Sequence, residues 1–238
     1  MISVAEARAI VLESVRAMPT ETVALGDALA RTLAEAIVAW RAQPPFVASA
    51  MDGYALRSAD TPGRLRVIGE AGAGRALTRP LAAGECARIF IGAPLPAGAD
   101  CVLIQEDAQR HGDVIVAPKM EAGHHLRQVG VDFGAGERLL EPGTVLDGAR
   151  LSITAAAGQA KITVARRPRI TILSGGDEIV SPGAEPGADQ IFDSASCGVA
   201  GLATAWGAIA RASSPFPTIV CVSPRRWMGR LAHRTSWS

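Results

Sequence analysis

The chain has 238 residues, of which 48% are hydrophobic and 20% are charged, and its formal net charge is +1. This composition excludes a disordered chain and predicts a globular protein of one or two domains. The small net charge argues against a nucleic-acid partner, and no apolar run reaches the roughly 20 residues that span a bilayer. We therefore expect a soluble cytoplasmic protein that binds neither nucleic acid nor membrane.

The first predicted element is a helix that begins after Ser3. Ser3 and Glu6 have the spacing of a capping box, and apolar residues recur at helical spacing before Pro19, which is the expected stop. A second short helix is predicted over residues 27–36. Residues 43–46 contain two consecutive prolines and are expected to form a rigid extended break.

Short β-like runs alternate with glycine- and proline-rich turns between residues 46 and 132. This spacing predicts a small β-barrel or sandwich. A short helix at 153–157 and a strand at 161–165 follow. The β-like runs lie at residues 65–68, 87–91, 101–105 and 114–117.

The next predicted unit begins at about residue 169. A short buried strand at 170–173 leads into a glycine-rich loop, and Asp193 caps an apolar helix that extends to about residue 210. This order is typical of the opening of an α/β domain with a parallel sheet, whose second strand would be residues 218–222. The predicted fold class is therefore a multidomain mixture of α+β and α/β structure.

The charged residues are unevenly distributed. All 23 acidic residues lie at or before Asp193, whereas residues 194–238 contain five arginines and no acidic residue. One interpretation is a basic tail that binds an anionic partner. The other is an aberrant tail, produced by a shifted reading frame or a truncation after about residue 211.

The cysteines and histidines give no metal signature. The four cysteines form no CxxC pair, so we expect buried free thiols. The neighbouring His124 and His125 would direct their rings differently on a strand, which argues against zinc.

Two segments of the predicted β region could carry chemistry. Residues 49–54 form a tight polar turn, in which Gly53 permits a close backbone approach and Asp52 supplies a carboxylate. Further along, Arg127 and Asp132 flank a glycine. Taken separately, an ordinary turn aspartate and a solvated surface ion pair are the alternatives.

A third candidate segment is the loop at residues 174–178. It follows a predicted parallel strand, and open α/β sheets bind ligands at that edge. Its glycines can offer N–H groups to an oxyanion, although a single glycine-rich loop is a weak signal.

Together these segments resemble the molybdopterin molybdotransferase family, the MoeA type that is related to the gephyrin E domain. Five motifs occur in the family's order over residues 1–210. They are Ser-Ala-Met-Asp-Gly-Tyr-Ala at 49–55, Gly-Ala-Pro-x-Pro-x-Gly-x-Asp at 92–100 with a Gln-Glu continuation at 105–106, Arg-x-x-Gly-x-Asp at 127–132, Gly-Asp-Glu at 176–178 and Gln-Ile-x-Asp-Ser at 190–194.

The resemblance implies a transferase of molybdenum cofactor biosynthesis. Such an enzyme inserts molybdate into adenylylated molybdopterin with the help of Mg²⁺ and releases AMP. The resemblance also implies an elongated homodimer and a pathway partner, molybdopterin adenylyltransferase. The active cleft would lie between the β domain of one subunit and the α/β domain of the other.

The same resemblance assigns the site residues. The carboxylates that would face the ligand are Asp52, Asp132, Asp177 and Glu178, and we expect Asp177 and Glu178 to bind the metal. The substrate-binding residues would be Gly53, Tyr54, Gly92, Arg127, Gly175, Gly176, Asp193 and Ser194.

The implied domains are numbered as follows. Residues 1–45 and 134–168 form an N-terminal linker or dimerisation domain, 46–133 a small β domain, 169–211 the beginning of a molybdopterin-binding α/β domain and 212–238 an aberrant or disordered basic tail.

The chain also departs from the family pattern. Ile91 stands where the family usually has threonine, Val131 where it often has an acidic residue, Gly175 where it has threonine and Ala195 where it has asparagine. Because the resemblance fades after about residue 210, we favour the reading-frame or truncation interpretation of the tail. The alternative function is a catalytically inactive remnant that acts as a dimerising scaffold or a weak ligand binder.

Overall fold

The computed structural model describes residues 2–213 and residue 215, and these residues form two compact units. One unit comprises the residues up to Glu21 and those from Val164 onward, and the other comprises residues 22–163. The mixed α and β fold class is confirmed, whereas the domain boundaries given above remain predictions.

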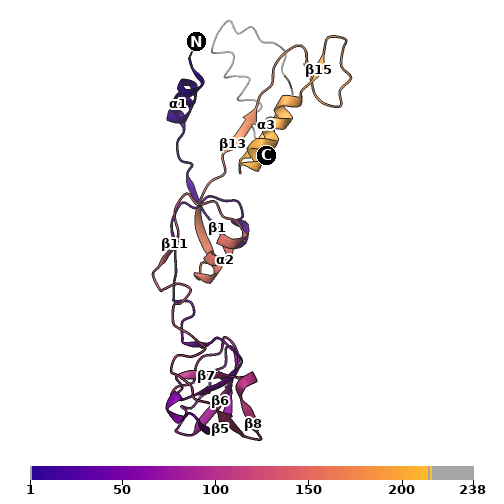
Figure 1. The fold of residues 1–238 in the computed structure, drawn as a ribbon. Coiled ribbons are helices and arrows are strands. Elements are labelled where there is room, and N and C mark those ends of the chain that lie inside the picture. The colour runs from indigo at the N-terminus through magenta and orange to yellow at the C-terminus, as the bar shows by residue number, and fades with distance from the viewer. Residues whose placement is uncertain (1, 214, 216–238) are drawn as a thin grey trace. The chain divides into compact units, whose positions relative to one another are not determined.

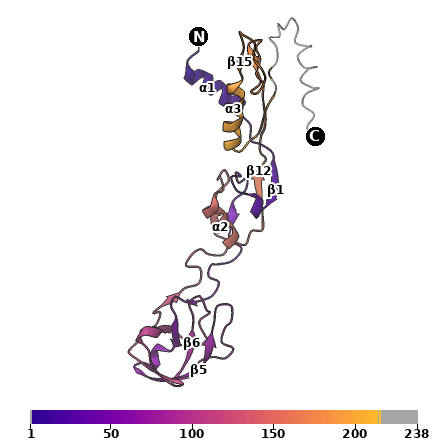
Figure 2. The same cartoon turned by 90° about the vertical axis from the view of Figure 1, so that its right-hand side faces the viewer.

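Six strands form the largest sheet, which lies within residues 22–163 (Figure 1). Their order is β7-β4-β6-β5-β9-β8. Neighbouring strands are antiparallel except β5 and β6, which run parallel and lie side by side in both views (Figure 2). The four β-like runs fall on strands of this sheet. The strands are β4 (Gly53–Leu56), β5 (Gly63–Ala71), β6 (Glu85–Ile89), β7 (Cys101–Ile104), β8 (Gln109–His111) and β9 (Val114–Ala117).

A hydrophobic cluster of side chains from these strands forms the core of the sheet. Burial raises the pKa of the Cys86 and Cys101 thiols to about 12, so neither is a reactive thiolate at neutral pH. Buried free thiols are therefore confirmed for these two residues, whereas Cys197 is exposed and Cys221 lies outside the described residues. The cluster comprises Tyr54, Leu56, Leu65, Cys86, Cys101, Leu103, Ile115, Ala117 and Met120.

The rest of this unit contains short elements. Strand β2 (Ile37–Val38) pairs antiparallel with β11 (Arg138–Leu140). Helix α2 (Gly148–Ala156) begins earlier than predicted because the Asp147 carboxylate accepts a hydrogen bond from the Arg150 N–H at 2.8 Å and caps the helix.

The predicted helix over residues 27–36 is wrong. A 3₁₀ turn, η1 (Leu25–Asp27), forms at its start, the chain turns again at Ala30, whose φ is 58°, and Thr32 forms an isolated antiparallel bridge with Val145. The Leu33 N–H donates to the Thr144 carbonyl at 2.9 Å. The backbone of this segment therefore bonds to a distant part of the chain, and this pairing outweighs its alanine-rich helix propensity.

The other unit begins with helix α1 (Val4–Ser14), at the predicted capping box. The Glu6 N–H donates to Ser3 Oγ at 3.2 Å, and the Ser3 N–H donates to Glu6 Oε2 at 2.7 Å. The helix ends at Ser14, before the predicted stop at Pro19. None of its residues is buried, so the caps and the helix's own hydrogen bonds define it locally.

Helix α3 (Ser194–Ala205) begins after Asp193, as predicted, but ends earlier than expected. Gly207 has a φ of 92°, a left-handed conformation that ends helices. The chain then forms β16 (Ile209–Ala212), which pairs in parallel with β13 (Arg169–Ile172). The parallel pairing was expected, but the second strand was predicted at residues 218–222 and is formed by residues 209–212.

Two further strand pairs lie outside the six-stranded sheet. Strand β14 (Ile179–Val180) pairs in parallel with β15 (Ile191–Phe192), and β1 (Thr20–Ala24) pairs with β12 (Lys161–Ala165). The strand predicted at 218–222 lies outside the described residues. Within the described part of the chain, no helix combines the length and apolar character needed to cross a membrane.

Glu85, at the start of β6, binds two arginines and a backbone amide. Its carboxylate accepts hydrogen bonds from Arg79 Nη1 at 2.9 Å, from Arg66 Nη2 at 3.0 Å and from the Ala82 N–H at 3.1 Å. The bond from Arg79, followed by that from Ala82, lowers the pKa of Glu85 from 4.5 to about 2. Because the folded-state pKa is the lower one, Glu85 stabilises the fold above pH 4.5, and this contribution is lost as the pH falls toward 2.

We therefore expect the free energy of unfolding, measured by urea denaturation, to fall as the pH is lowered from about 5 to about 2. Glu85→Gln should make this fall smaller, because glutamine does not titrate in that range. Glu70→Gln is the matched control because Glu70 forms an exposed ion pair with Arg75, and such pairs add little stability. A Glu85→Gln profile that runs parallel to the wild type would contradict this assignment.

Gly53 of β4 lies against the backbone of the neighbouring strand. A Cβ at this position would be 1.9 Å from the Leu103 carbonyl oxygen. We expect Gly53→Ala to lower the free energy of unfolding by about 3 kcal/mol or to prevent folding, because one strand must move away. Gly26→Ala is the control, since its Cβ would meet no atom within 4 Å. Equal urea midpoints for the two variants would refute the close approach.

Candidate functional site

Three of the sequence motifs meet at the backbone of Ser49, which is fully buried. The Ser49 N–H donates to the Ala93 carbonyl at 3.0 Å, and the Ser49 carbonyl accepts from the Gly92 N–H at 2.9 Å. Strand β3 (Ala48–Ser49) also pairs antiparallel with β10 (Leu126–Arg127). The Asp-Gly turn, the Gly-Ala-Pro segment and the Arg-to-Asp segment are therefore joined by main-chain hydrogen bonds. We call this region the Ser49 junction.

Asp52 is fixed beside the junction by two backbone amides. The Ile91 N–H donates to Asp52 Oδ1 at 2.8 Å, and the Gln105 N–H donates to the Asp52 carbonyl at 3.1 Å. Within the turn, Ser49 Oγ donates to the Met51 carbonyl at 2.5 Å. The carboxylate of Asp52 is half-buried, and among the described residues no donor is bonded to its Oδ2. This oxygen is therefore open to a ligand.

Gly53 and Tyr54 follow Asp52 but lie inside the fold. Gly53 is buried, and Tyr54 is 5% exposed and belongs to the core cluster of the six-stranded sheet. Both residues therefore help to pack β4 between its neighbours β6 and β7. A direct contact between either residue and a substrate remains a prediction.

Arg127 and Asp132 form the predicted ion pair. Arg127 Nη2 lies 2.7 Å from Asp132 Oδ1, and both side chains are almost half exposed. The Asp132 N–H donates to the Gln43 carbonyl at 3.0 Å, and the Gly130 N–H donates to the Pro44 carbonyl at 2.9 Å. The segment is therefore held against the two-proline break, although an ion pair this exposed adds little stability by itself.

A cavity of about 190 Å³ lies beside the ion pair. Three of its lining residues, Gly92, Arg127 and Asp132, were assigned to the site from the sequence. Asp52 bonds to Ile91, the chain neighbour of Gly92. Three predicted residues therefore line one cavity, and the fourth, Asp52, is hydrogen-bonded to the residue next to Gly92. The full lining of the cavity is Gln43, Pro44, Pro45, Phe46, Ala48, Gly92, Arg127 and Asp132.

The other predicted residues form a second cluster, in the unit that contains α3. Asp193 caps α3 through a bond from the Ser196 N–H to Oδ1 at 3.1 Å. Its Oδ2 accepts from Ser174 Oγ at 2.6 Å and from Ser196 Oγ at 2.5 Å. The Ser174 hydroxyl, and then the Ser196 hydroxyl, lower the pKa of Asp193. Asp193 therefore ties the glycine-rich loop to the start of the helix, and its oxygens are occupied within the protein.

Asp177 and Glu178 lie on the exposed part of this loop. The Asp177 carbonyl accepts from Gln190 Nε2 at 3.0 Å, and the Glu178 carbonyl accepts from the Ile191 N–H at 2.7 Å. Gly176 is buried, and a Cβ on it would lie 2.5 Å from Glu178 Oε2, so glycine allows the carboxylate to fold back over the loop. Gly175 and Ser194 are exposed on either side of this arrangement.

The donor set of this loop is compatible with magnesium. Among the described residues, no group of three or more His, Cys, Asp or Glu side chains could hold a metal ion. Mg²⁺ is usually held by one or two carboxylates together with waters and substrate phosphates. Asp177 and Glu178 match that requirement by residue type and exposure.

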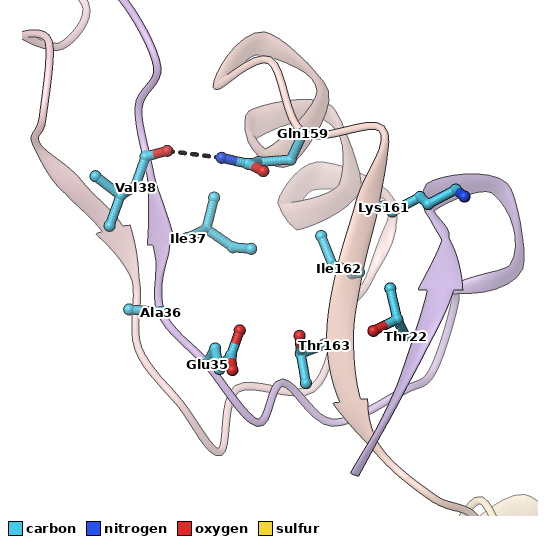
Figure 3. Close-up of a pocket in the computed structure, with 9 residues that line it drawn as sticks. All are labelled: Thr22, Glu35, Ala36, Ile37, Val38, Gln159, Lys161, Ile162 and Thr163. Carbon is cyan, nitrogen blue, oxygen red and sulfur yellow. Dashed lines mark hydrogen bonds between the residues drawn. The ribbon is translucent and has the colours of Figure 1, made fainter.

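A separate cavity of about 140 Å³ lies between residues 35–38 and the start of β12 (Figure 3). Gln159 closes one side of it by donating from Nε2 to the Val38 carbonyl at 3.0 Å. None of the predicted site residues lines it. The lining residues are Thr22, Glu35, Ala36, Ile37, Val38, Gln159, Lys161, Ile162 and Thr163.

The sequence interpretation missed one wall of the larger cavity. Residues 43–46 were expected only to break the chain, but they line the cavity and hold Asp132 through the Gln43 carbonyl. Their prolines did signal a fixed backbone. No reactive side chain marked the segment as part of a site, because its contribution is made by carbonyl oxygens and by shape.

Known proteins share this architecture. A family model described as the MoeA N-terminal region (domain I and II) matches residues 2–158. A molybdopterin molybdenumtransferase 2 of Mycobacterium tuberculosis is 36% identical over 204 residues, which cover 82% of this chain and 50% of that protein. A molybdopterin molybdenumtransferase of Nostoc sp. is 36% identical over 197 residues, which cover 79% of this chain and 45% of that protein.

Solved structures agree with the sequence relatives. The molybdopterin biosynthesis MoeA protein of Pyrococcus horikoshii OT3 superposes with a TM-score of 0.88 at 28% identity. The match covers 98% of this chain and 64% of that one. This chain spans about half the length of the curated relatives it matches.

Whether Asp193 holds the glycine-rich loop to the start of α3 can be tested by hydrogen exchange. In Asp193→Ala, the amide of Ser196 loses its acceptor, and we expect it to exchange faster together with the loop around Ser174. Asp193→Asn is the matched control because asparagine also caps helices, and its Ser196 amide should stay protected. Equal exchange at Ser196 in the alanine and asparagine variants would show that the cap does not depend on this side chain.

Proposed function

This chain belongs to the MoeA family, and from that premise we propose that it acts in molybdenum cofactor biosynthesis as a molybdopterin molybdenumtransferase. The proposed reaction inserts molybdate into adenylylated molybdopterin in the presence of Mg²⁺ and releases AMP. One observation carries the proposal. The Ser49 junction joins a cavity lined by Gly92, Arg127 and Asp132 to the turn of Asp52, whose carboxylate is hydrogen-bonded to the residue next to Gly92. All of these residues lie within the part of the chain that matches the MoeA N-terminal region.

The charges at this cavity determine what it can bind. The two charged lining residues, Arg127 and Asp132, neutralise each other, and Asp52 of the Ser49 junction adds one formal negative charge nearby. Molybdate is a dianion, and a carboxylate about 4 Å from an anionic oxygen costs on the order of 4 kcal/mol at an effective dielectric of about 20. A divalent cation that enters with the anionic substrate would offset this repulsion, which supports the proposed requirement for Mg²⁺ in the reaction.

We expect the residues of the cavity and of the adjoining Asp52 turn to contact the ligand in different ways. Arg127 uses one nitrogen for Asp132 and keeps other donors for an oxyanion, which a guanidinium binds through charge-assisted hydrogen bonds. Asp52 keeps Oδ2 free for a ligand donor or a hydrated cation. The Gly92 N–H already donates to the Ser49 carbonyl, so Gly92 offers no backbone donor to a ligand. Its φ of 77° shows that its role is to form the turn.

The second cluster would supply the metal ligands. We assign Mg²⁺ to Asp177 and Glu178, which would hold it together with phosphate oxygens of the substrate. When bound, the ion neutralises phosphate charge. Gly175 and Gly176 allow close approach of the loop backbone, while Asp193 fixes the loop and Ser194 begins the helix behind it.

Three further parts of the proposal follow from the family resemblance. They are a homodimer, a supply of adenylylated substrate from molybdopterin adenylyltransferase, and a cytoplasmic location.

The test is a reconstitution with the purified chain, adenylylated molybdopterin, molybdate and Mg²⁺. AMP release is measured by chromatography, and cofactor formation by the activity gained by a cofactor-free molybdoenzyme. We expect Asp52→Asn and Asp132→Asn each to lower AMP release by about tenfold to a hundredfold. Asp113→Asn is the control, because Asp113 is exposed between β8 and β9 and neither lines the cavity nor bonds to the Ser49 junction.

The outcomes distinguish the transferase from the inactive scaffold or weak ligand binder. Binding of molybdopterin, followed by fluorescence titration, without AMP release would favour the scaffold or weak binder over the enzyme. A wild-type chain that neither binds nor reacts would refute both ligand-dependent functions. Removal of Mg²⁺ with a chelator should stop AMP release, and full activity after chelation would contradict the metal assignment.

A further inference from the structure

Arg88, on β6, was not among the residues singled out from the sequence, and its side chain is fixed by two aromatic rings. Arg88 lies opposite Tyr54 of β4 in the antiparallel register. Its guanidinium carbon is 5.2 Å from the centre of the Tyr54 ring and 5.1 Å from the centre of the Phe90 ring. Both distances are within the range of cation–π attraction, so the guanidinium has a defined position.

From that position Arg88 reaches the turn that carries Asp52. Arg88 Nη1 donates to the Gly53 carbonyl at 3.3 Å, and Nη2 donates to Gln105 Oε1. The Gln105 N–H in turn donates to the Asp52 carbonyl at 3.1 Å. One side chain therefore holds the two successive carbonyls of the turn, the Gly53 carbonyl directly and the Asp52 carbonyl through Gln105.

Arg88 donates to neutral acceptors, whereas the neighbouring arginines pair with a carboxylate. Arg66 and Arg79 pair with Glu85, whereas no carboxylate in the described part of the chain forms an ion pair with Arg88. Its donors go to a main-chain carbonyl and an amide oxygen. A planar guanidinium presents two donors in a fixed fork, which a lysine ammonium cannot reproduce.

We propose that Arg88 is a positioning residue for Asp52. By fixing the Gly53 carbonyl and Gln105, it holds the turn in which the Ile91 N–H meets Asp52 Oδ1 and leaves Oδ2 open. Its effect on ligand binding rests on the function proposed above. Its effect on the turn can be observed without any ligand.

The first measurement is amide hydrogen exchange on the ligand-free chain. In Arg88→Ala, we expect the Ile91 and Gln105 amides to exchange about tenfold faster, because both donate to Asp52. Arg64→Ala is the matched control, since it removes the same charge from an exposed position on β5 of the same sheet. If Arg88→Ala does not fold, Arg88→Lys keeps the charge and stem and should show the same change to a smaller extent.

The second measurement is a double-mutant cycle on the affinity for adenylylated molybdopterin with Mg²⁺. Arg88→Ala should weaken binding about tenfold in the wild type and have no further effect in the Asp52→Asn background. Such dependence on Asp52 is expected of a positioning residue. General destabilisation or a direct contact between Arg88 and the ligand would weaken binding equally in both backgrounds.

The two measurements keep this proposal separate from the proposed function. Unchanged exchange at Ile91, or an equal loss of affinity in both backgrounds, would overturn the role of Arg88. If the wild-type chain binds no molybdopterin, the proposed function fails, and the exchange experiment still decides whether Arg88 holds the Asp52 turn.

Discussion

Main-chain hydrogen bonding at Ser49 is the constraint on which the candidate site depends. A fully buried backbone cannot leave its N–H and C=O groups unpaired without a cost in stability, so Ser49 must find partners within the protein. The partners it finds, Ala93 and Gly92, belong to a second motif, and the pairing of β3 with β10 brings in the third. The same bonds that satisfy the fold therefore also place Asp52, Arg127 and the cavity.

The groups around Asp52 are mostly neutral. Backbone amides fix its carboxylate and its carbonyl, and the nearby guanidinium of Arg88 is spent on carbonyl and amide oxygens. Neutral donors orient a carboxylate without cancelling its charge. Asp193 in the other unit is arranged differently, because its Oδ2 accepts hydrogen bonds from the Ser174 and Ser196 hydroxyls and thereby holds the loop. These contrasting surroundings suit a ligand-facing role for Asp52 and a structural role for Asp193.

Local signals in the sequence predicted the fold well where a few neighbouring residues decide the structure. The capping box at Ser3, the cap at Asp193 and the β-like runs of the six-stranded sheet are of this kind. The helix expected over residues 27–36 failed because Leu33 bonds to Thr144, a partner that no local pattern reveals. Helix α3 ended early for a related reason, since the chain after Gly207 is recruited as a strand beside β13.

By itself, the sequence determined the residue types of the site and the motifs that contain them, because carboxylates at glycine turns are visible as short ordered patterns. Only the tertiary structure decided which of them share a cavity, that residues 43–46 form its wall, and that Arg88 supports Asp52. The reason is physical. Those relations are made by backbone carbonyls and ring contacts between strands far apart in the chain, and such contacts leave no periodic or compositional trace.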